Sequence, residues 1–272
     1  MHHHHPPTTV NHTHNRPTRQ KMVNMLMEHL HDTELWANYL PRIPRRLYLL
    51  AFLGIGLIVA AFAMFRNGQT LLGGIGFGLS VLFIVPLILM GLFVRWKRNR
   101  SLELRRQILD SILWRGDEKV LDVGCGNGLL LNGAAMRLTG GEAIGIDIWA
   151  DHGGGGTQEL LWRNARVEKV ADKIEFREVD ARKMPFERAT FDVVVSSGAM
   201  HHISRTPADF DQALHEMIRV LKPGGQIVIA DVAHMVNACA SRMRPAGVGC
   251  EVKETGRFLG YEMGIVFGTK VG

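Results

Sequence analysis

The chain has 272 residues, of which 46% are hydrophobic, and its charge is unevenly divided. Residues 1–100 hold 11 basic and 3 acidic side chains, whereas residues 101–272 hold 21 and 23. The second part therefore lacks the broad basic face typical of nucleic-acid binding, which argues against an RNA or DNA substrate. The three cysteines, at positions 125, 239 and 250, show no metal-ligand spacing and suit a reducing compartment.

The first 46 residues are rich in histidine, with 8 of the 13 histidines among residues 1–31. A segment of this composition can bind metal, but we expect a largely disordered segment or the remnant of a tag. Residues 22–40 mix apolar and polar side chains at near-helical spacing. That pattern fits either an interfacial helix on a membrane or an ordinary helix packed on the rest of the protein.

Two long apolar segments come next, residues 47–65 without a charge and residues 71–94 with Ser80 as their clearly polar side chain. About 20 apolar residues span the hydrocarbon core of a bilayer, so both segments predict transmembrane helices. Basic side chains precede the first segment and follow the second, while Arg66 is the one charge between them. By the positive-inside rule, both termini and everything after the second helix lie in the cytoplasm.

Small residues recur four apart in both segments, as Gly56 with Ala60 and Gly74 with Gly78. Such pairs let helices approach closely in lipid, although glycine is also simply tolerated there. One hypothesis is therefore that these pairs form the contact between the two helices.

From about residue 101 onward, short apolar strands alternate with helical patterns, which predicts a parallel, doubly wound sheet. Thr206 and Pro207 provide a capping hydroxyl and a first-turn proline for a helix that should end near Val220. Residues 226–231 then form a fifth strand, and two β-rich runs around Gly260 form a final hairpin.

The most informative run is Val-Leu-Asp-Val-Gly-Cys-Gly-Asn-Gly at residues 120–128, where a strand ends in a glycine turn and a helical pattern begins. The glycines permit backbone angles and a close ligand approach that other residues obstruct. A dinucleotide fingerprint would read G-x-G-x-x-G, whereas this run reads G-x-G-x-G after Asp122. A carboxylate there repels a pyrophosphate but pairs with an ammonium group. The run therefore predicts a zwitterionic, nucleoside-like ligand.

This run resembles motif I of the class I S-adenosylmethionine-dependent methyltransferases, and further motifs of that family follow in order. They are the strand 143–147 ending in Asp147, the strand 174–180 ending in Asp180, the fourth strand 191–196, and the turn 221–225 before the fifth. The resemblance covers about residues 101–272. It implies an α/β fold with a Rossmann-like seven-stranded methyltransferase sheet, preceded here by a transmembrane helical hairpin, and S-adenosylmethionine as the cofactor.

The resemblance also implies which residues bind the cofactor. Asp147 would accept the ribose hydroxyls, and the segment at Asp180 and Ala181 would hold the adenine edge. The full expected set is Asp122, Gly124, Cys125, Gly126, Asn127, Gly128, Asp147, Ile148, Asp180, Ala181 and Ser196. No metal ligand belongs to it.

His201 and His202 follow the fourth strand at its carboxyl end, where open α/β sheets bind their ligands. Either histidine is a candidate base or acceptor-orienting residue, while the alternative is that both only pack at the lip of the pocket. Asp151 and the four glycines at 153–156 lie between the second strand and the next helix. Asp151 is either a contact of the ribose or adenine or a solvated loop acid, and the glycines predict a mobile segment beside the cofactor or a plain flexible loop.

These features predict a membrane-anchored methyltransferase that acts on a small or lipophilic acceptor at the cytoplasmic face of the membrane. The catalytic half is similar to methyltransferases of quinone and other secondary metabolism, which are usually soluble. A different hypothesis is a non-catalytic scaffold that retains the cofactor pocket. A nicotinamide-dependent dehydrogenase is opposed by the glycine spacing and by Asp122.

Overall fold

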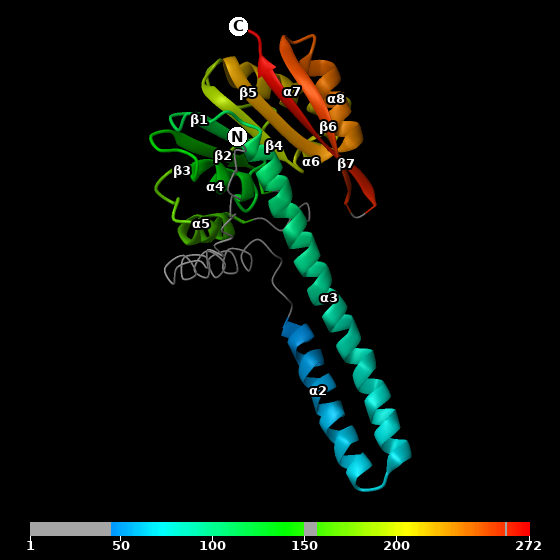
Figure 1. Ribbon diagram of the computed structural model, residues 1–272. Coiled ribbons are helices and arrows are strands. Elements are labelled where there is room, and N and C mark those ends of the chain that lie inside the picture. Colours follow the sequence, from blue (N-terminus) through cyan, green and yellow to red (C-terminus); the bar gives the residue numbers. More distant parts are fainter. Residues whose placement is uncertain (1–44, 150–156, 259) are drawn as a thin grey trace, which may run out of the picture.

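The computed structural model describes residues 45–149, 157–258 and 260–272 (Figure 1). Helices α2 (Arg45–Arg66) and α3 (Thr70–Asp110) form an antiparallel hairpin that projects from an α/β domain. The helical pattern expected within residues 22–40, and the expected roles of Asp151 and of the glycines at 153–156, lie outside the described residues.

The domain is built on a seven-stranded sheet of order β3-β2-β1-β4-β5-β7-β6. Strands β1 to β5 pair in parallel, and β7 pairs antiparallel with both β5 and β6. The strands are β1 (Lys119–Val123), β2 (Glu142–Asp147), β3 (Ile174–Glu178), β4 (Phe191–Ser197), β5 (Leu221–Val232), β6 (Val248–Phe258) and β7 (Tyr261–Lys270). The predicted Rossmann-like sheet with a terminal hairpin is confirmed.

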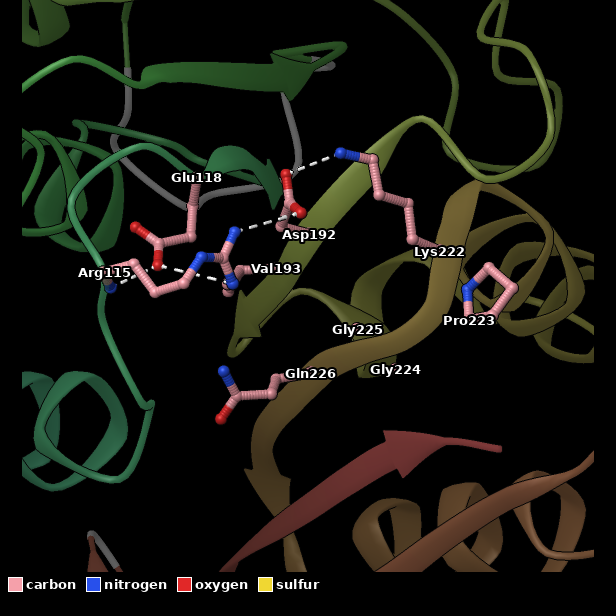
Figure 2. A pocket seen from close by; sticks show the side chains of 9 residues that line it. All are labelled: Arg115, Glu118, Asp192, Val193, Lys222, Pro223, Gly224, Gly225 and Gln226. Atoms are coloured by element: carbon pink, nitrogen blue, oxygen red, sulfur yellow. Dashed lines mark hydrogen bonds and ion pairs between the residues drawn. The ribbon is translucent and has the colours of Figure 1, made fainter. Parts of the chain in front are cut away.

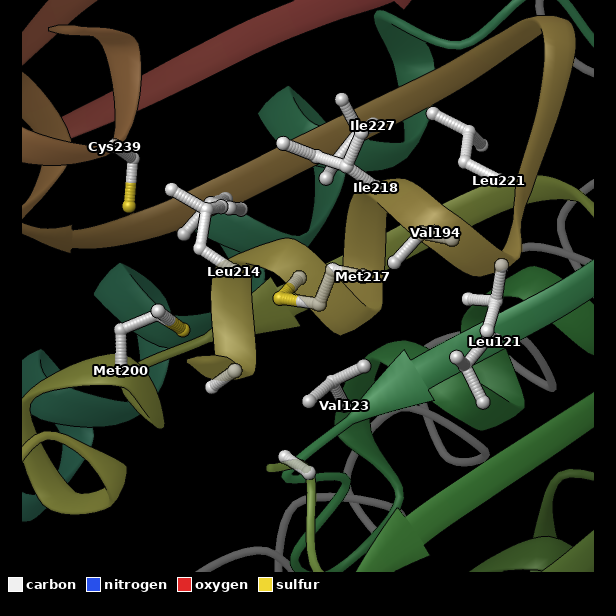
Figure 3. Close-up of a cluster of buried hydrophobic side chains, with 14 of the residues drawn as sticks. Leu121, Val123, Val194, Met200, Leu214, Met217, Ile218, Leu221, Ile227 and Cys239 are labelled. Carbon is white, nitrogen blue, oxygen red and sulfur yellow. The ribbon is translucent and has the colours of Figure 1, made fainter. Parts of the chain in front are cut away.

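Both faces of the sheet are covered by helices, which is why the central strands are continuously apolar. The helices of the domain are α4 (Leu129–Ala135), α5 (Gln158–Val167), α6 (Met200–Ile203), α7 (Pro207–Val220) and α8 (Ala233–Met243). Successive residues of a strand point to opposite faces, so Leu121 and Val123 pack in one cluster with Leu214 and Met217 of α7 (Figure 3). Val120 instead packs in the second cluster, with α4 and the end of α3.

Helix α7 begins and ends where the sequence predicts. The Thr206 hydroxyl accepts a hydrogen bond from Asp209 N, and the Asp209 side chain accepts one from Thr206 N, which completes a capping box. The chain then enters β5 directly, five residues earlier than expected. Phe191 pairs with Leu221 but Val193 pairs with Gln226, so residues 222–225 bulge out of the strand.

The last turns of α3 belong to the domain. Ile108 and Leu109 are fully buried in the second cluster, although the sequence predicted that the apolar helix would end at residue 94, apart from a domain beginning near 101. The helix instead continues without interruption from Thr70 to Asp110. Among the residues that the structure describes, α3 is the one helix whose length and composition would let it cross a membrane, and the apolar stretch Phe52–Arg66 of α2 is shorter.

Glycines do form the contact between α2 and α3, but they are not the predicted ones. A methyl group at Gly54 would lie 2.9 Å from Ile84 Cγ1, and one at Gly76 would lie 3.3 Å from Ala61 Cβ. Methyl groups at Gly56, Gly74 and Gly78 would meet no described atom within 4 Å. The predicted pairs therefore face outward, because the packing of larger side chains sets the rotation of each helix.

Candidate functional site

The glycine loop lies where the sequence predicts it, between the carboxyl end of β1 and the start of α4. Gly124 N and Cys125 N both donate to Ile146 O, at 2.8 and 3.1 Å, which ties the loop to the end of β2. Gly124, Gly126 and Gly128 have φ values of +73°, +50° and +83°. All three therefore adopt the left-handed conformation that favours glycine.

Two of these glycines have different physical reasons to lack a side chain. A methyl group at Gly124 would lie 2.2 Å from Ala199 Cβ, so this position is needed for close packing against the chain after β4. A methyl group at Gly126 would meet none of the described atoms within 4 Å. The open space at Gly126 is on the side from which a ligand can approach the backbone.

Asp122 is buried beneath this loop, with 2% of its surface exposed. Its carboxyl group accepts a hydrogen bond from the Leu131 backbone N–H, while Oδ2 has no partner among the described residues. Burial, aided by the nearby charge of Asp147, raises the pKa of Asp122 to about 8. An unsatisfied carboxylate oxygen at such a site fits a cationic hydrogen-bond donor, such as the ammonium group of S-adenosylmethionine.

Asp147 ends β2 beside the same loop. Its Oδ2 accepts from Gly126 N and its Oδ1 from Trp149 N, both at 2.9 Å. A carboxylate has about four lone-pair sites, so these two bonds fix its orientation and leave room for two ribose hydroxyls. Ile148 follows with an exposed side chain, and the Trp149 ring stacks on Phe176 with centroids 4.1 Å apart.

Asp180 follows the end of β3, next to the end of β2, since Val179 N donates to Asp147 O. Arg182 holds its carboxylate, with Nη2 2.7 Å from Oδ2, and also bonds Asp209 at 2.6 Å. The Arg182 hydrogen bonds hold the pKa of Asp180 below its usual range. Ala181 is buried in the first core cluster. Sequence reasoning missed Arg182, although a basic residue two positions after an expected ligand acid was a visible signal.

The other side chains of the expected set bond within the protein. Asn127 joins the loop to α5, because its Oδ1 accepts from Thr157 N and its main-chain oxygen from Asn164 Nδ2. Ser196 is fully buried and its Oγ donates to Val123 O at 2.8 Å. Cys125 is also buried, which raises the pKa of its thiol. The side chains of Ser196 and Cys125 therefore take no part in the proposed cofactor site.

His201 lies on the one-turn helix α6 and is held by Asp231 at the end of β5. Its Nδ1 is 2.7 Å from Asp231 Oδ1, and its backbone N–H donates to Asp231 Oδ2 at 3.2 Å. Asp231 is fully buried, and its hydrogen bond raises the pKa of His201 above the usual value. Because Nδ1 is committed to Asp231, Nε2 is the ring nitrogen able to exchange a proton with a substrate. The His202 ring lies beside that of His201, with centroids 3.9 Å apart.

Asp231 was missed as a functional residue. The prediction from the sequence placed Asp231 only as the last residue of the fifth strand. The signal was its place: β5 is the neighbour of β4, so an acid at its carboxyl end meets whatever follows β4. Asp147, Asp180 and His201, which the sequence predicted as site residues, thus lie at the carboxyl ends of the parallel strands. Asp231, which was not predicted, lies at the same end.

A cavity of about 130 Å³ lies at the opposite edge, by the amino ends of β1 and β4 (Figure 2). Its charged side chains pair with one another: Asp192 bonds Lys222 at 2.8 Å and lies 3.4 Å from Arg115. The buried Glu118 carboxylate accepts from the backbone N–H groups of Arg115 and Gly116. This cavity is separate from the glycine loop, which lies at the carboxyl end of β1.

Residues 121–229 match the family model described as "Methyltransferase domain". This chain contains a methyltransferase domain. The cofactor that this match supports is S-adenosylmethionine, which the resemblance of the glycine loop and the later motifs implied.

The curated relatives that are similar to this region include two methyltransferases. Methyltransferase GfsG of Streptomyces halstedii is 32% identical over 129 residues, which cover 47% of this chain and 43% of that protein. The demethylmenaquinone methyltransferase of Thermus thermophilus is 29% identical over 131 residues, covering 48% and 54%. The chain spans about half the length of the curated relatives it matches.

Among solved structures, the cyclase SpnF is similar in fold, with a TM-score of 0.51 and 18% identity over 64% of this chain and 82% of that chain. A protein named as a cyclase thus shares this fold. The fold by itself therefore does not decide the reaction, which depends on the residues of the site.

Proposed function

We propose that this protein is a membrane-anchored methyltransferase, which transfers a methyl group from S-adenosylmethionine to a small or lipophilic acceptor at the cytoplasmic face of the membrane. One observation carries the proposal. The glycine loop lies at the same end of the parallel strands as the His201–Asp231 pair, and below the loop one oxygen of Asp122 has no partner among the described residues.

The residues around the loop would hold the cofactor in the following way. Asp122 would pair with the ammonium group, Asp147 with the ribose hydroxyls, and the segment at Asp180 and Ala181 with the adenine edge. Gly126 would let the backbone approach closely. When bound, S-adenosylmethionine supplies a methyl group already activated by its sulfonium, so the protein has mainly to orient the acceptor and exclude water.

His201 would act as the base for an acceptor that must lose a proton. Its Nε2 accepts the proton of a hydroxyl, amine or acidic carbon, while Asp231 holds the ring in the required tautomer and stabilises the resulting imidazolium. This division of roles resembles that of other carboxylate-oriented histidines, in which the buried acid keeps its charge.

The hairpin of α2 and α3 supports the membrane part of the proposal. In the described part of the chain, all but five of the exposed large hydrophobic side chains lie on these two helices. A water-soluble protein rarely exposes so large an apolar surface. Ser80, the one clearly polar side chain of the apolar segment 71–94, is buried. Its hydroxyl donates to Phe77 O at 2.6 Å, which satisfies it within the helix as lipid requires.

The arrangement of the helices also supports a cytoplasmic location of the domain. Because Gly54 faces Ile84 and Ala61 faces Gly76, the start of α2 lies level with about residue 93 of α3. Arg45 and Arg46, the first residues of α2, and the basic residues at 95–100 of α3 therefore lie at one end of the hairpin. By the positive-inside rule that end is cytoplasmic.

The acceptor is proposed to be lipophilic and quinone-like. One relative is named a demethylmenaquinone methyltransferase, and a membrane-anchored enzyme would meet such an acceptor where it dissolves. The test is to incubate the detergent-purified full chain with labelled S-adenosylmethionine and membrane lipid, and to separate lipid, small-molecule and protein fractions. Label in the lipid fraction that disappears in His201→Ala supports the proposal. Cofactor binding without any transfer of label would instead favour the non-catalytic scaffold.

A further inference from the structure

Helix α3 crosses the domain between the amino ends and the carboxyl ends of the parallel strands. Just after it ends, Leu113 N donates to Gln226 Oε1, near the start of the parallel part of β5, at 3.0 Å. Earlier along the helix, Arg100 Nη2 donates to Thr255 O of β6 at 3.1 Å. The apolar part of α3 therefore leaves the domain at the β6 end of this path (Figure 1).

The strand register shows that α3 leaves the domain at the carboxyl ends of the parallel strands. Gly256, next to Thr255, pairs with Met263, and Met263 pairs with Val232 at the carboxyl end of β5. Asp231, the partner of His201, is adjacent. Arg100 thus contacts the sheet level with the His201–Asp231 pair, and the apolar hairpin extends from the same edge as the glycine loop.

The distance along α3 places this edge close to a bilayer. Val94 is the last residue of the apolar segment and lies six residues before Arg100, or about 9 Å at the rise of an α-helix. The headgroup layer on each side of a bilayer is roughly 5–8 Å thick. The edge that carries the site would therefore lie just outside the headgroups.

The β6–β7 hairpin extends further in the same direction. Tyr261 lies two residues beyond Met263, about 7 Å nearer to the membrane at the rise of a strand. It is 67% exposed, although it is a large hydrophobic residue outside the helical hairpin. Arg257 beside it is also exposed and lies 3.1 Å from Glu262. Tyrosine and arginine are both favoured at the membrane interface.

The connection between α3 and the domain is rigid. Arg105 lies 2.7 Å from Glu168 in a buried ion pair, and Ile108 and Leu109 are fully buried. A rigid helix fixes the orientation of the domain on the membrane, which a flexible linker would leave free.

We propose that the tip of the β6–β7 hairpin, at Tyr261, is a second membrane contact that holds the cofactor edge against the lipid surface. The acceptor then enters the site from the bilayer side. This inference rests on the membrane anchoring proposed above, and it adds a fixed orientation and a second contact with lipid.

The test uses the full chain in vesicles of phosphatidylcholine and phosphatidylglycerol that carry nitroxide lipids. A fluorophore is attached to single cysteines in a Cys250→Ser background, since Cys125 and Cys239 are buried. Tyr261→Cys reports on the hairpin tip, Leu113→Cys at the opposite edge is the matched exposed control, and Leu82→Cys on α3 reports on the anchor. Each variant is first checked for binding of S-adenosylhomocysteine, and Glu262→Cys replaces Tyr261→Cys if the latter fails that check.

Headgroup nitroxides should quench the fluorophore at the hairpin tip and leave the one at residue 113 bright, while acyl-chain nitroxides quench the one at residue 82. A bright fluorophore at the tip together with quenching at residue 82 would overturn the second contact and leave the anchor intact. An unquenched fluorophore at residue 82 would refute the anchor and the second contact together, while leaving the methyltransferase assay unaffected.

Discussion

Replacing Asp122 with asparagine should stabilise the cofactor-free protein at pH 8 and weaken cofactor binding. The carboxyl group is buried, one of its oxygens has no partner in the described part of the chain, and its pKa is raised from 3.8 to about 8. A group whose pKa is raised on folding stabilises the folded state below its unfolded pKa, and this contribution is lost as the pH rises through the folded pKa. An asparagine side chain does not titrate, keeps a similar shape, and can still accept the hydrogen bond from Leu131 N–H.

The size of the effect follows from the shift. About four pKa units at about 1.4 kcal/mol each give a loss on the order of 5 kcal/mol for the wild type between pH 4 and pH 8. This is comparable with the whole unfolding free energy of many domains. The free energy of unfolding of Asp122→Asn should therefore fall less with rising pH, so that the two proteins diverge progressively toward pH 8.

The assay is urea unfolding of the full chain in detergent at pH 5 and pH 8, followed by tryptophan fluorescence, because Trp114, Trp149 and Trp162 lie in the domain. Calorimetry with S-adenosylmethionine gives the binding arm, in which loss of the charged pair should cost tenfold or more in affinity. Equal slopes of stability with pH in the two proteins would refute the reasoning about burial. Unchanged affinity would remove Asp122 from the ammonium site.

Three further predictions concern the base, the loop and the anchor. Because a base must be neutral to accept a proton, kcat/KM should rise with pH through the raised pKa of His201. Asp231→Asn should move this rise to lower pH and lower the plateau. A pH profile that does not move would contradict the His201–Asp231 pairing. Gly124→Ala should lower the melting temperature sharply because its methyl group meets Ala199. Gly126→Ala should cost about 1 kcal/mol in stability and should mainly weaken cofactor binding in calorimetry. Similar losses of stability and of binding in both variants would contradict the separate roles of the two glycines. Deleting residues 1–100 should leave cofactor affinity nearly unchanged but strongly reduce transfer to a bilayer acceptor, and equal rates for the two proteins would argue for a water-soluble acceptor.

Local signals explain why so much of the fold could be predicted from the sequence. Residues 206–225 contain the capping hydroxyl, the first-turn proline and the terminating turn of α7. The bounds of this helix in the structure therefore match the predicted ones. The glycine loop and the acids at the strand ends could be placed because parallel strands end at a common edge. These features depend on neighbours in sequence or on a regular topology.

The contacts that were missed depend on packing between distant elements. His201 and Asp231 are 30 residues apart, and their meeting requires both the adjacency of β4 and β5 and the turn that starts α6. The face on which α2 and α3 meet likewise depends on the rotation of each helix. Gly54 and Gly56 are equally small, and periodicity alone does not separate the one in contact from the one facing outward.

The continuity of α3 was missed for another reason. The basic run at 95–100 ends the apolar segment of the sequence, and the prediction took it as the end of the helix as well. Arginine, lysine, leucine, glutamate and glutamine are all good helix formers, and they dominate residues 95–109. A change in polarity along a helix reports a change of solvent, which need not coincide with a change of backbone conformation.

A rigid α3 constrains the acceptor as well as the domain. If the hairpin spans the bilayer, His201 lies near the level of Arg100, about 9 Å beyond the end of the apolar segment. The atom that receives the methyl group must then leave the hydrocarbon while the rest of the molecule stays dissolved in it. A polar ring carried on a long apolar tail meets this requirement, whereas a wholly apolar molecule does not. The anchor would thus select among lipids by where each one places its reactive group.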